Sequence, residues 1–217
     1  MLSLGQLIPF LLAVALIELT PGPNMGYLAV VASQSGRAAG MATVAGITLG
    51  LSLYLLASVF GLSEAALRWP WIYQTLRWAG VAYLLWLAVD TWRGASLKAP
   101  PAPDHRSLFL RGLLNNLLNP KAAVFYVALL PGFIRPQDGQ PLVQALVLGA
   151  IHITISVLIH TTIVLTASHA RSVMQGGGPG KSPVILQRAF AIGLAAIALW
   201  LAVSTPDLAA VPSNALP

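Results

Sequence analysis

Long apolar segments are the feature that most constrains this chain. The segment from Leu142 to Ala167 contains no Asp, Glu, Lys or Arg. A helix needs about 20 mostly apolar residues to cross the hydrocarbon core of a bilayer, and this segment is longer than that. Of all residues, 57% are apolar and only 8% are charged, whereas a soluble domain has about 25% charged residues. The sequence therefore predicts an all-α membrane protein with several spans.

Six segments have the length and composition of a membrane span, and they fall into two groups of three. The first half of the chain, residues 1–95, and the second half, residues 112–204, are joined by a linker at 96–111 that is rich in proline and charge. The tail at 205–217 is expected to be flexible. The spans are predicted at about residues 4–33, 41–62, 71–92, 112–134, 142–167 and 184–203.

Basic residues gather in alternate loops. The loops after the second and fourth spans carry only Arg68 and Arg135, and Arg77 lies at the start of the third span. Cytoplasmic loops carry an excess of Lys and Arg, so the other loops are expected to be cytoplasmic and both termini periplasmic. The net charge of +6 then reflects topology, and no nucleic-acid partner is expected. The basic residues of the expected cytoplasmic loops are Arg37, Arg93, Lys98, Arg106, Arg111, Arg171, Lys181 and Arg188.

The first span is interrupted by the stretch LTPGPNMGY, which starts at Leu19. Proline cannot donate a backbone hydrogen bond and clashes with the preceding turn, but it fits the first turn of a helix. Thr20 is a favourable capping residue before Pro21, and Asn24 is an alternative cap after Gly22 and Pro23. The stretch therefore predicts that one half-helix ends here and another begins.

A similar stretch, LNPKAAVFY from Leu118, interrupts the fourth span. An offset of 99 residues superimposes Pro120 on Pro21, Tyr126 on Tyr27 and Gly149 on Gly50. Three spans in each half give the halves opposite orientations, so the layout predicts a 3+3 inverted repeat with proline-broken helices one and four, as in many secondary transporters. The alternative is a chance alignment of two leucine-rich helices on a proline.

Two ionisable residues lie beside these breaks. Lys121 falls in the first turn of the second half-helix, where the helix dipole disfavours a cation. It is expected either to bind a carboxylate or act as a gating charge, or to reach the membrane surface with its long side chain. Glu18 is the one acid well inside a predicted span. Ionisable groups within a span are functional candidates, so Glu18 is expected to be a proton-coupling carboxylate or a counter-charge for a substrate ammonium. The alternatives are a residue near the membrane interface or a partner for a lysine elsewhere.

No catalytic or metal site is predicted. The chain has no cysteine, and His152 and His160, two turns apart on the fifth span, are too few for a metal site. They are expected to serve as polar lining or in core hydrogen bonds. Glycines with GxxxG spacing from Gly36 to Gly50 permit close helix packing or a homodimer. The sequence contains no Walker, HExxH or GxSxG motif, so neither a cofactor nor an enzymatic activity is expected.

The chain resembles LysE/RhtB-type amino-acid exporters over nearly its whole length. The resemblance is carried by TPGPNM in the first span, the glycine-rich second span, GVAYLLWLAVDTWR in the third and GLLNNLLNPKAAVFYVALLPGF in the fourth. Such proteins export amino acids from bacterial cells and are thought to use the proton motive force. The resemblance implicates Thr20, Pro21, Gly22, Pro23, Asn24, Asn116, Asn119, Pro120 and Lys121 in substrate binding or gating.

Two departures from the family pattern bear on this assignment. Many members carry an acid after the PGP motif, where this chain has Asn24, and many carry PQF where it has Pro131, Gly132 and Phe133. We therefore consider Glu18 as the coupling carboxylate.

The resemblance implies a secondary transporter in the bacterial inner membrane. It would export amino acids or close derivatives, with protons as the coupling ion and the lipid bilayer as its surroundings. The alternatives are an uncoupled facilitator, an exporter of another small solute, or a membrane assembly component that does not transport.

Overall fold

The computed structural model describes residues 4–20, 22–62, 70–94, 104–176 and 183–204, and nearly all of these are helical, with no strand among them. The prediction of an all-α chain is therefore confirmed. The elements are α1 (Leu4–Leu19), α2 (Pro23–Ser35), α3 (Arg37–Ala57), η1 (Ser58–Leu62), α5 (Pro70–Gly94), α6 (His105–Leu117), α7 (Pro120–Val124), η2 (Phe125–Leu129), α8 (Leu130–Gly132), η3 (Pro136–Asp138), α9 (Pro141–Gly176) and α10 (Pro183–Ser204).

Within the described residues, two helical stretches, Arg37–Gly61 and Pro141–Ser172, are long and apolar enough to cross a membrane. The count rises to four if each of two bent helix pairs forms one span. Helices α5 and α10, with 25 and 22 residues, also have the length of a span. The count of six spans stays a prediction.

Both predicted helix breaks are present as bends. Helices α1 and α2 meet at 52°, and α6 meets the helical segment Pro120–Gly132 at 52°. Each break includes a proline that begins the next half-helix, Pro23 for α2 and Pro120 for α7. The proline signal therefore located both interruptions.

Helix α6 begins before the residues predicted for the fourth span. Helix α6 starts at His105 and not at Gly112, so the second part of the predicted linker at 96–111 is helical. Asp104 explains the difference, because its side chain accepts a hydrogen bond of 3.1 Å from the backbone N–H of Arg106 and caps the helix. Residues 95–103 lie outside the described ranges.

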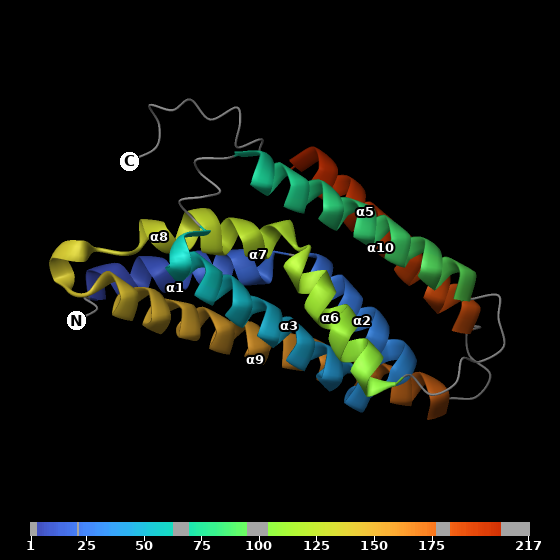
Figure 1. The fold of residues 1–217 in the computed structure, drawn as a ribbon. Helices are drawn as coiled ribbons and strands as arrows, with labels where there is room; N and C mark the ends of the chain where they lie inside the picture. Colours follow the sequence, from blue (N-terminus) through green and yellow to red (C-terminus); the bar gives the residue numbers. More distant parts are fainter. Residues whose placement is uncertain (1–3, 21, 63–69, 95–103, 177–182, 205–217) are drawn as a thin grey trace.

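The chain runs back and forth between two ends of the bundle (Figure 1). The ends of α2, α5 and α9 lie at the same end as the starts of α3, α6 and α10. This end collects the basic residues that the sequence assigned to alternate loops, whereas Arg135 lies at the opposite end beside η3. Lys98 and Lys181, and Arg68 of the opposite set, lie outside the described residues. The described basic residues of this end are Arg37, Arg93, Arg106, Arg171 and Arg188, whereas Arg111 lies midway along α6.

Glycines bring the helices into close contact within the chain. A Cβ atom at Gly46 of α3 would overlap the backbone of α6 at Phe109, and one at Gly112 of α6 would lie 2.5 Å from the carbonyl oxygen of Thr43 on α3. A Cβ atom at Gly50 would lie 2.6 Å from the side chain of Asn116. Gly46 and Gly50 of the GxxxG region are thus covered by α6 of the same chain. The homodimer stays a prediction without their support.

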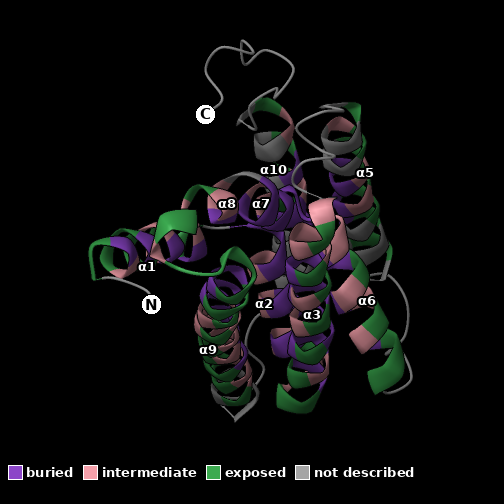
Figure 2. Cartoon of the chain, turned by 60° about the vertical axis from the view of Figure 1, so that its left-hand side comes forward, coloured by how far each residue is buried: buried purple, intermediate pink, exposed green. Residues whose placement is uncertain are grey.

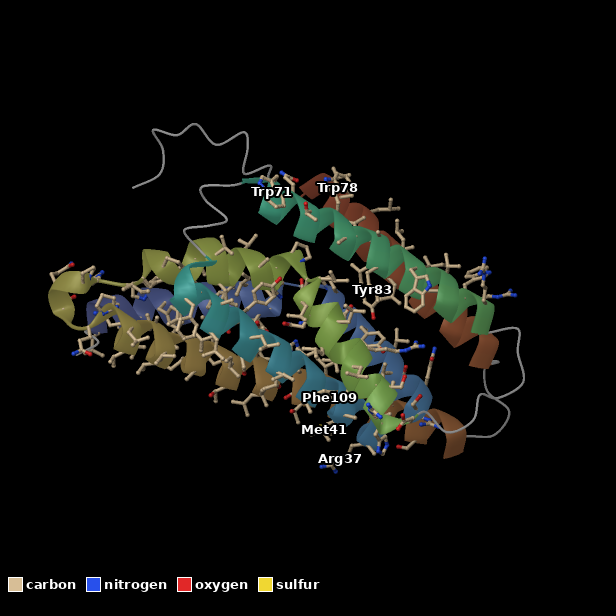
Figure 3. The ribbon with its side chains drawn as sticks, viewed as in Figure 1. Arg37, Met41, Trp71, Trp78, Tyr83 and Phe109 are labelled. Carbon is tan, nitrogen blue, oxygen red and sulfur yellow. The ribbon has the colours of Figure 1, made fainter. Side chains whose placement is uncertain are left out.

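The buried residues form the facing sides of the helices, and the outer turns are apolar and exposed (Figure 2). Helix α5 packs along α10 and shows the same division. Its Trp71 and Trp78 point away from the bundle, and Tyr83 points toward the other helices (Figure 3). Exposed tryptophan and leucine suit a surface that faces lipid.

Candidate functional site

Among the described residues, the first break has no side-chain cap at the start of its second helix. Gly22 is the residue that precedes α2. The predicted caps are therefore wrong: Thr20 donates its hydroxyl to the carbonyl of Leu16 within α1 at 2.7 Å, and Asn24 lies inside α2. The second proline causes this shift, because Pro23 takes the first helical position and moves the cap to Gly22. Pro21 lies outside the described residues.

The second break is closed by its own side chain. The side-chain oxygen of Asn119 accepts a hydrogen bond of 3.0 Å from the backbone N–H of Lys121. Asn119 has extended backbone angles and Pro120 follows at the first helical position, which is the arrangement that the sequence predicted. Both residues are buried.

A hydrogen bond joins the two breaks. The ammonium group of Lys121 donates to the backbone carbonyl of Thr20 at 2.8 Å, across 101 residues of sequence. The carbonyl groups of the last turn of a helix have no partner within the helix and carry partial negative charge, so the cation of α7 stabilises the end of α1. Gly22 gives room for this side chain, since a Cβ atom there would lie 3.3 Å from Cδ of Lys121.

Among the described residues, the ion-pair partner of Glu18 is a histidine. Its Oε1 lies 3.1 Å from Nε2 of His152 on α9. The other ring nitrogen of His152, Nδ1, lies 3.0 Å from the hydroxyl of Tyr126 on η2. Glu18, His152 and Tyr126 are 5%, 2% and 0% exposed. A buried charge requires a partner, and here the partner comes from a helix 134 residues away in sequence.

Aromatic rings fix this cluster from two sides. The ring of Phe125 stacks on His152 with centroids 3.6 Å apart, and Tyr54 of α3 stacks on Tyr126 at 6.0 Å. The hydroxyl of Tyr54 donates to the carbonyl of Leu117 at 2.7 Å. This carbonyl is at the end of α6, so the ring stack connects the cluster to the second break.

A small cavity lies between the two breaks and α9. The first break contributes Glu18, Gly22 and Asn24, and the second contributes Asn119 and Lys121. Its volume, about 20 Å³, holds about one water molecule and is too small for an amino acid. The structure is therefore closed around these side chains.

Of the remaining predicted site residues, Asn24 lines the cavity and Asn116 does not. The side-chain oxygen of Asn24 accepts a hydrogen bond of 2.8 Å from Asn115, which ties α2 to α6. Asn116 is fully buried and neither its amide nitrogen nor its oxygen has a partner among the described residues. Pro23, Pro120 and the side chain of Thr20 do not line the cavity.

Three residues of α9 complete the cavity wall: His152, Ser156 and His160. Nδ1 of His160 lies 3.3 Å from the hydroxyl of Ser156. The sequence predicted the two histidines as polar lining, which this geometry confirms, but it did not predict their partners. Within the described ranges, no group of three or more His, Cys, Asp or Glu residues is placed to hold a metal ion.

Comparisons with known proteins identify the family. The LysE type translocator family matches residues 15–205. The homoserine/homoserine lactone efflux protein of Salmonella typhimurium is 32% identical over 171 residues, which cover 77% of this chain and 82% of the relative. The threonine efflux protein of Escherichia coli is 30% identical over 141 residues, or 59% of this chain and 68% of the relative. No solved structure matches the chain.

A third relative supports the membrane assignment. An uncharacterized membrane protein of Pseudomonas aeruginosa is 31% identical over 166 residues, which cover 72% of this chain and 77% of that protein. Together with the apolar helices, these matches make the chain a multi-pass membrane protein. The motifs around the two breaks lie within the matched region, and the chain belongs to the family of LysE type translocators.

Proposed function

We propose that this protein is a secondary transporter of the bacterial inner membrane that exports amino acids from the cytoplasm, driven by the proton motive force. The relatives named for homoserine and threonine efflux support an amino-acid substrate. The observation that carries the proposal is the meeting of both helix breaks at one polar cavity, with Lys121 bound to the carbonyl of Thr20.

The first break suits both charges of an amino acid. The end of α1 presents carbonyl groups with partial negative charge, and the start of α2 presents N–H groups with partial positive charge. The ammonium of the substrate would lie at the Thr20 carbonyl and Glu18. Its carboxylate would lie at the N–H groups of Asn24 and Met25 and at the Lys121 side chain. Lys121 occupies the ammonium position until the substrate replaces it there.

Substrate binding requires the cavity to open, because it holds about one water in this structure. The cavity is formed by elements of both halves of the chain, so a movement of one half against the other would open it. Such rocking gives alternating access in transporters built from inverted repeats. In the expected 3+3 repeat, the two three-span halves are the bodies that move against each other. The termini are expected to be periplasmic and the basic loops cytoplasmic.

Export from intact bacteria tests the proposal. Cells that express the protein are loaded with amino acids through dipeptides, and the external concentrations are followed with and without a protonophore. Release of homoserine, threonine or another amino acid that the protonophore blocks is the expected result. Release that the protonophore does not affect would instead indicate an uncoupled facilitator. No release, with the protein present in the membrane, would contradict amino-acid export.

A further inference from the structure

The carboxylate of Glu18, which the sequence offered alone as the coupling group, is paired with the imidazole of His152. They come from α1 and α9, lie 3.1 Å apart and form part of the cavity wall. We infer that the transported proton is held by the Glu18–His152 pair, with His152 as the group that titrates and Tyr126 as the residue that positions it. This inference rests on the proposed function and names the residue that couples it to protons.

The hydrogen bonds define one resting state of this pair. When Glu18 is a carboxylate, it can only accept, so Nε2 of His152 carries a hydrogen and donates to Oε1. In a neutral imidazole, the other nitrogen is then an acceptor, and Nδ1 accepts the hydroxyl hydrogen of Tyr126 at 3.0 Å. In this state the pair carries one negative charge.

The pair can take up one proton without losing either contact. The proton adds to Nδ1 of His152, both ring nitrogens become donors, and the Tyr126 hydroxyl changes from donor to acceptor. The stacked ring of Phe125 holds the imidazole in place. The charge of the pair changes from minus one to zero. Nδ1 of His152 is the ring nitrogen that acts as an acceptor in the resting state, so it is the atom of the ring that can take up the proton.

The charged and titratable groups around the pair make proton uptake compete with substrate binding. Lys121 of α7 and His160 of α9 share the cavity with it, and Tyr54 of α3 stacks on Tyr126. While the pair is negative, it attracts the ammonium group of an amino acid. Once the pair is neutral, Lys121 is the dominant cation in the cavity and repels that ammonium. A site that holds either a proton or an ammonium group is what exchange of one for the other requires.

The test uses His152→Gln, which keeps a hydrogen-bond donor toward Glu18 but cannot titrate. Purified protein in liposomes is assayed with labelled threonine and labelled homoserine in two ways. One assay measures exchange of the amino acid at equal pH on both sides. The other measures uptake driven by a liposome interior more acidic than the medium. His169→Gln, an exposed position on the same helix outside the cavity, is the matched control.

We expect His152→Gln to lose gradient-driven uptake at neutral pH to the level of protein-free liposomes, while exchange at equal pH, even if slower because His152 lines the cavity, stays above that level. His169→Gln should keep both. Gradient-driven uptake that persists in His152→Gln would overturn the inference and leave the proposed function intact. Loss of exchange as well, in protein that is folded by gel filtration, would assign His152 to binding or structure and also overturn it. A wild-type protein that exchanges neither amino acid would contradict the proposed function, and the inference with it.

Discussion

The two helix breaks bend the chain by the same angle but are built differently. At the first break, the residue before α2 is Gly22 and no described side chain caps the helix. At the second break, the side chain of Asn119 caps α7. The first break has an acid on its N-terminal side, Glu18, whereas the second has a cation on its C-terminal side, Lys121. Similar proline motifs therefore produce one break whose second helix has no described side-chain cap and one break whose second helix is capped by Asn119.

This difference suggests a division of roles. The first break offers bare helix ends, which bind charge through the backbone. At the second break, Asn119 already caps the backbone of α7. This break therefore contributes the side chain of Lys121, which donates to the carbonyl of Thr20. A second contrast is packing, because Gly80 of α5 places its backbone against the carbonyl of Leu118 at the second break. Each of these differences can be removed by one substitution.

The largest effect is expected for Gly80→Ala. The added methyl group would overlap the Leu118 carbonyl, and backbone atoms at a helix break cannot move aside as a flexible side chain can. Overpacking of this kind costs about 1–3 kcal/mol or more. We expect a large loss of folded protein from the membrane, measured by fluorescence-detected gel filtration.

Gly193→Ala on α10 is the matched control, since a Cβ atom there meets nothing within 4 Å. It should fold as well as the wild-type protein. Equal yields for both variants would show that α5 does not brace the second break.

The second-largest effect is expected for Lys121→Ala. The side chain is proposed to bind the substrate carboxylate, and hydrogen bonds to charged groups contribute about 1.5–3 kcal/mol. This corresponds to a loss of affinity of roughly ten- to a hundredfold. The apparent affinity for threonine or homoserine in liposome exchange measures it. Exchange with unchanged affinity would remove Lys121 from the site, whereas the protein yield should stay close to that of the wild type.

The smallest effect is expected for Asn119→Ala, which removes the cap of the second break. Loss of such a cap costs about 0.5–2 kcal/mol, and we expect a lower Tm in detergent with export reduced but present. Asn119→Ser, which restores a capping oxygen, should recover most of the loss. If both variants unfold at the wild-type temperature, the cap does not stabilise the break, and the contrast between the two breaks disappears.

The sequence predicted the features that depend on neighbouring residues. The prolines located both bends, and the pair of Asn119 and Pro120 predicted its cap correctly. Thr20 and Pro21 predicted the wrong cap, because a second proline two residues later competes for the start of α2. Helix α6 also extends into the predicted linker, because Asp104 caps it within that polar stretch.

The contacts that make the site were not predictable from one sequence. Glu18 and His152 are separated by 134 residues and Lys121 and Thr20 by 101 residues, and no local spacing encodes such pairs. The sequence identified Glu18 and Lys121 because ionisable groups are costly inside a membrane. It could not show that Lys121 binds a backbone carbonyl, because every residue carries one.

The central claim is that both breaks border one amino-acid site, and cysteine protection tests it directly. The chain has no cysteine of its own, so Met25→Cys at the first break and Ala122→Cys at the second can each be labelled selectively with a small methanethiosulfonate reagent. Both positions line the cavity. Ser172→Cys is the control, because Ser172 on α9 is exposed and lies outside the cavity. Threonine or homoserine should slow labelling at Met25→Cys and Ala122→Cys and leave Ser172→Cys unchanged. Protection at one break only, or at neither, in protein that still transports the amino acid would contradict a shared site.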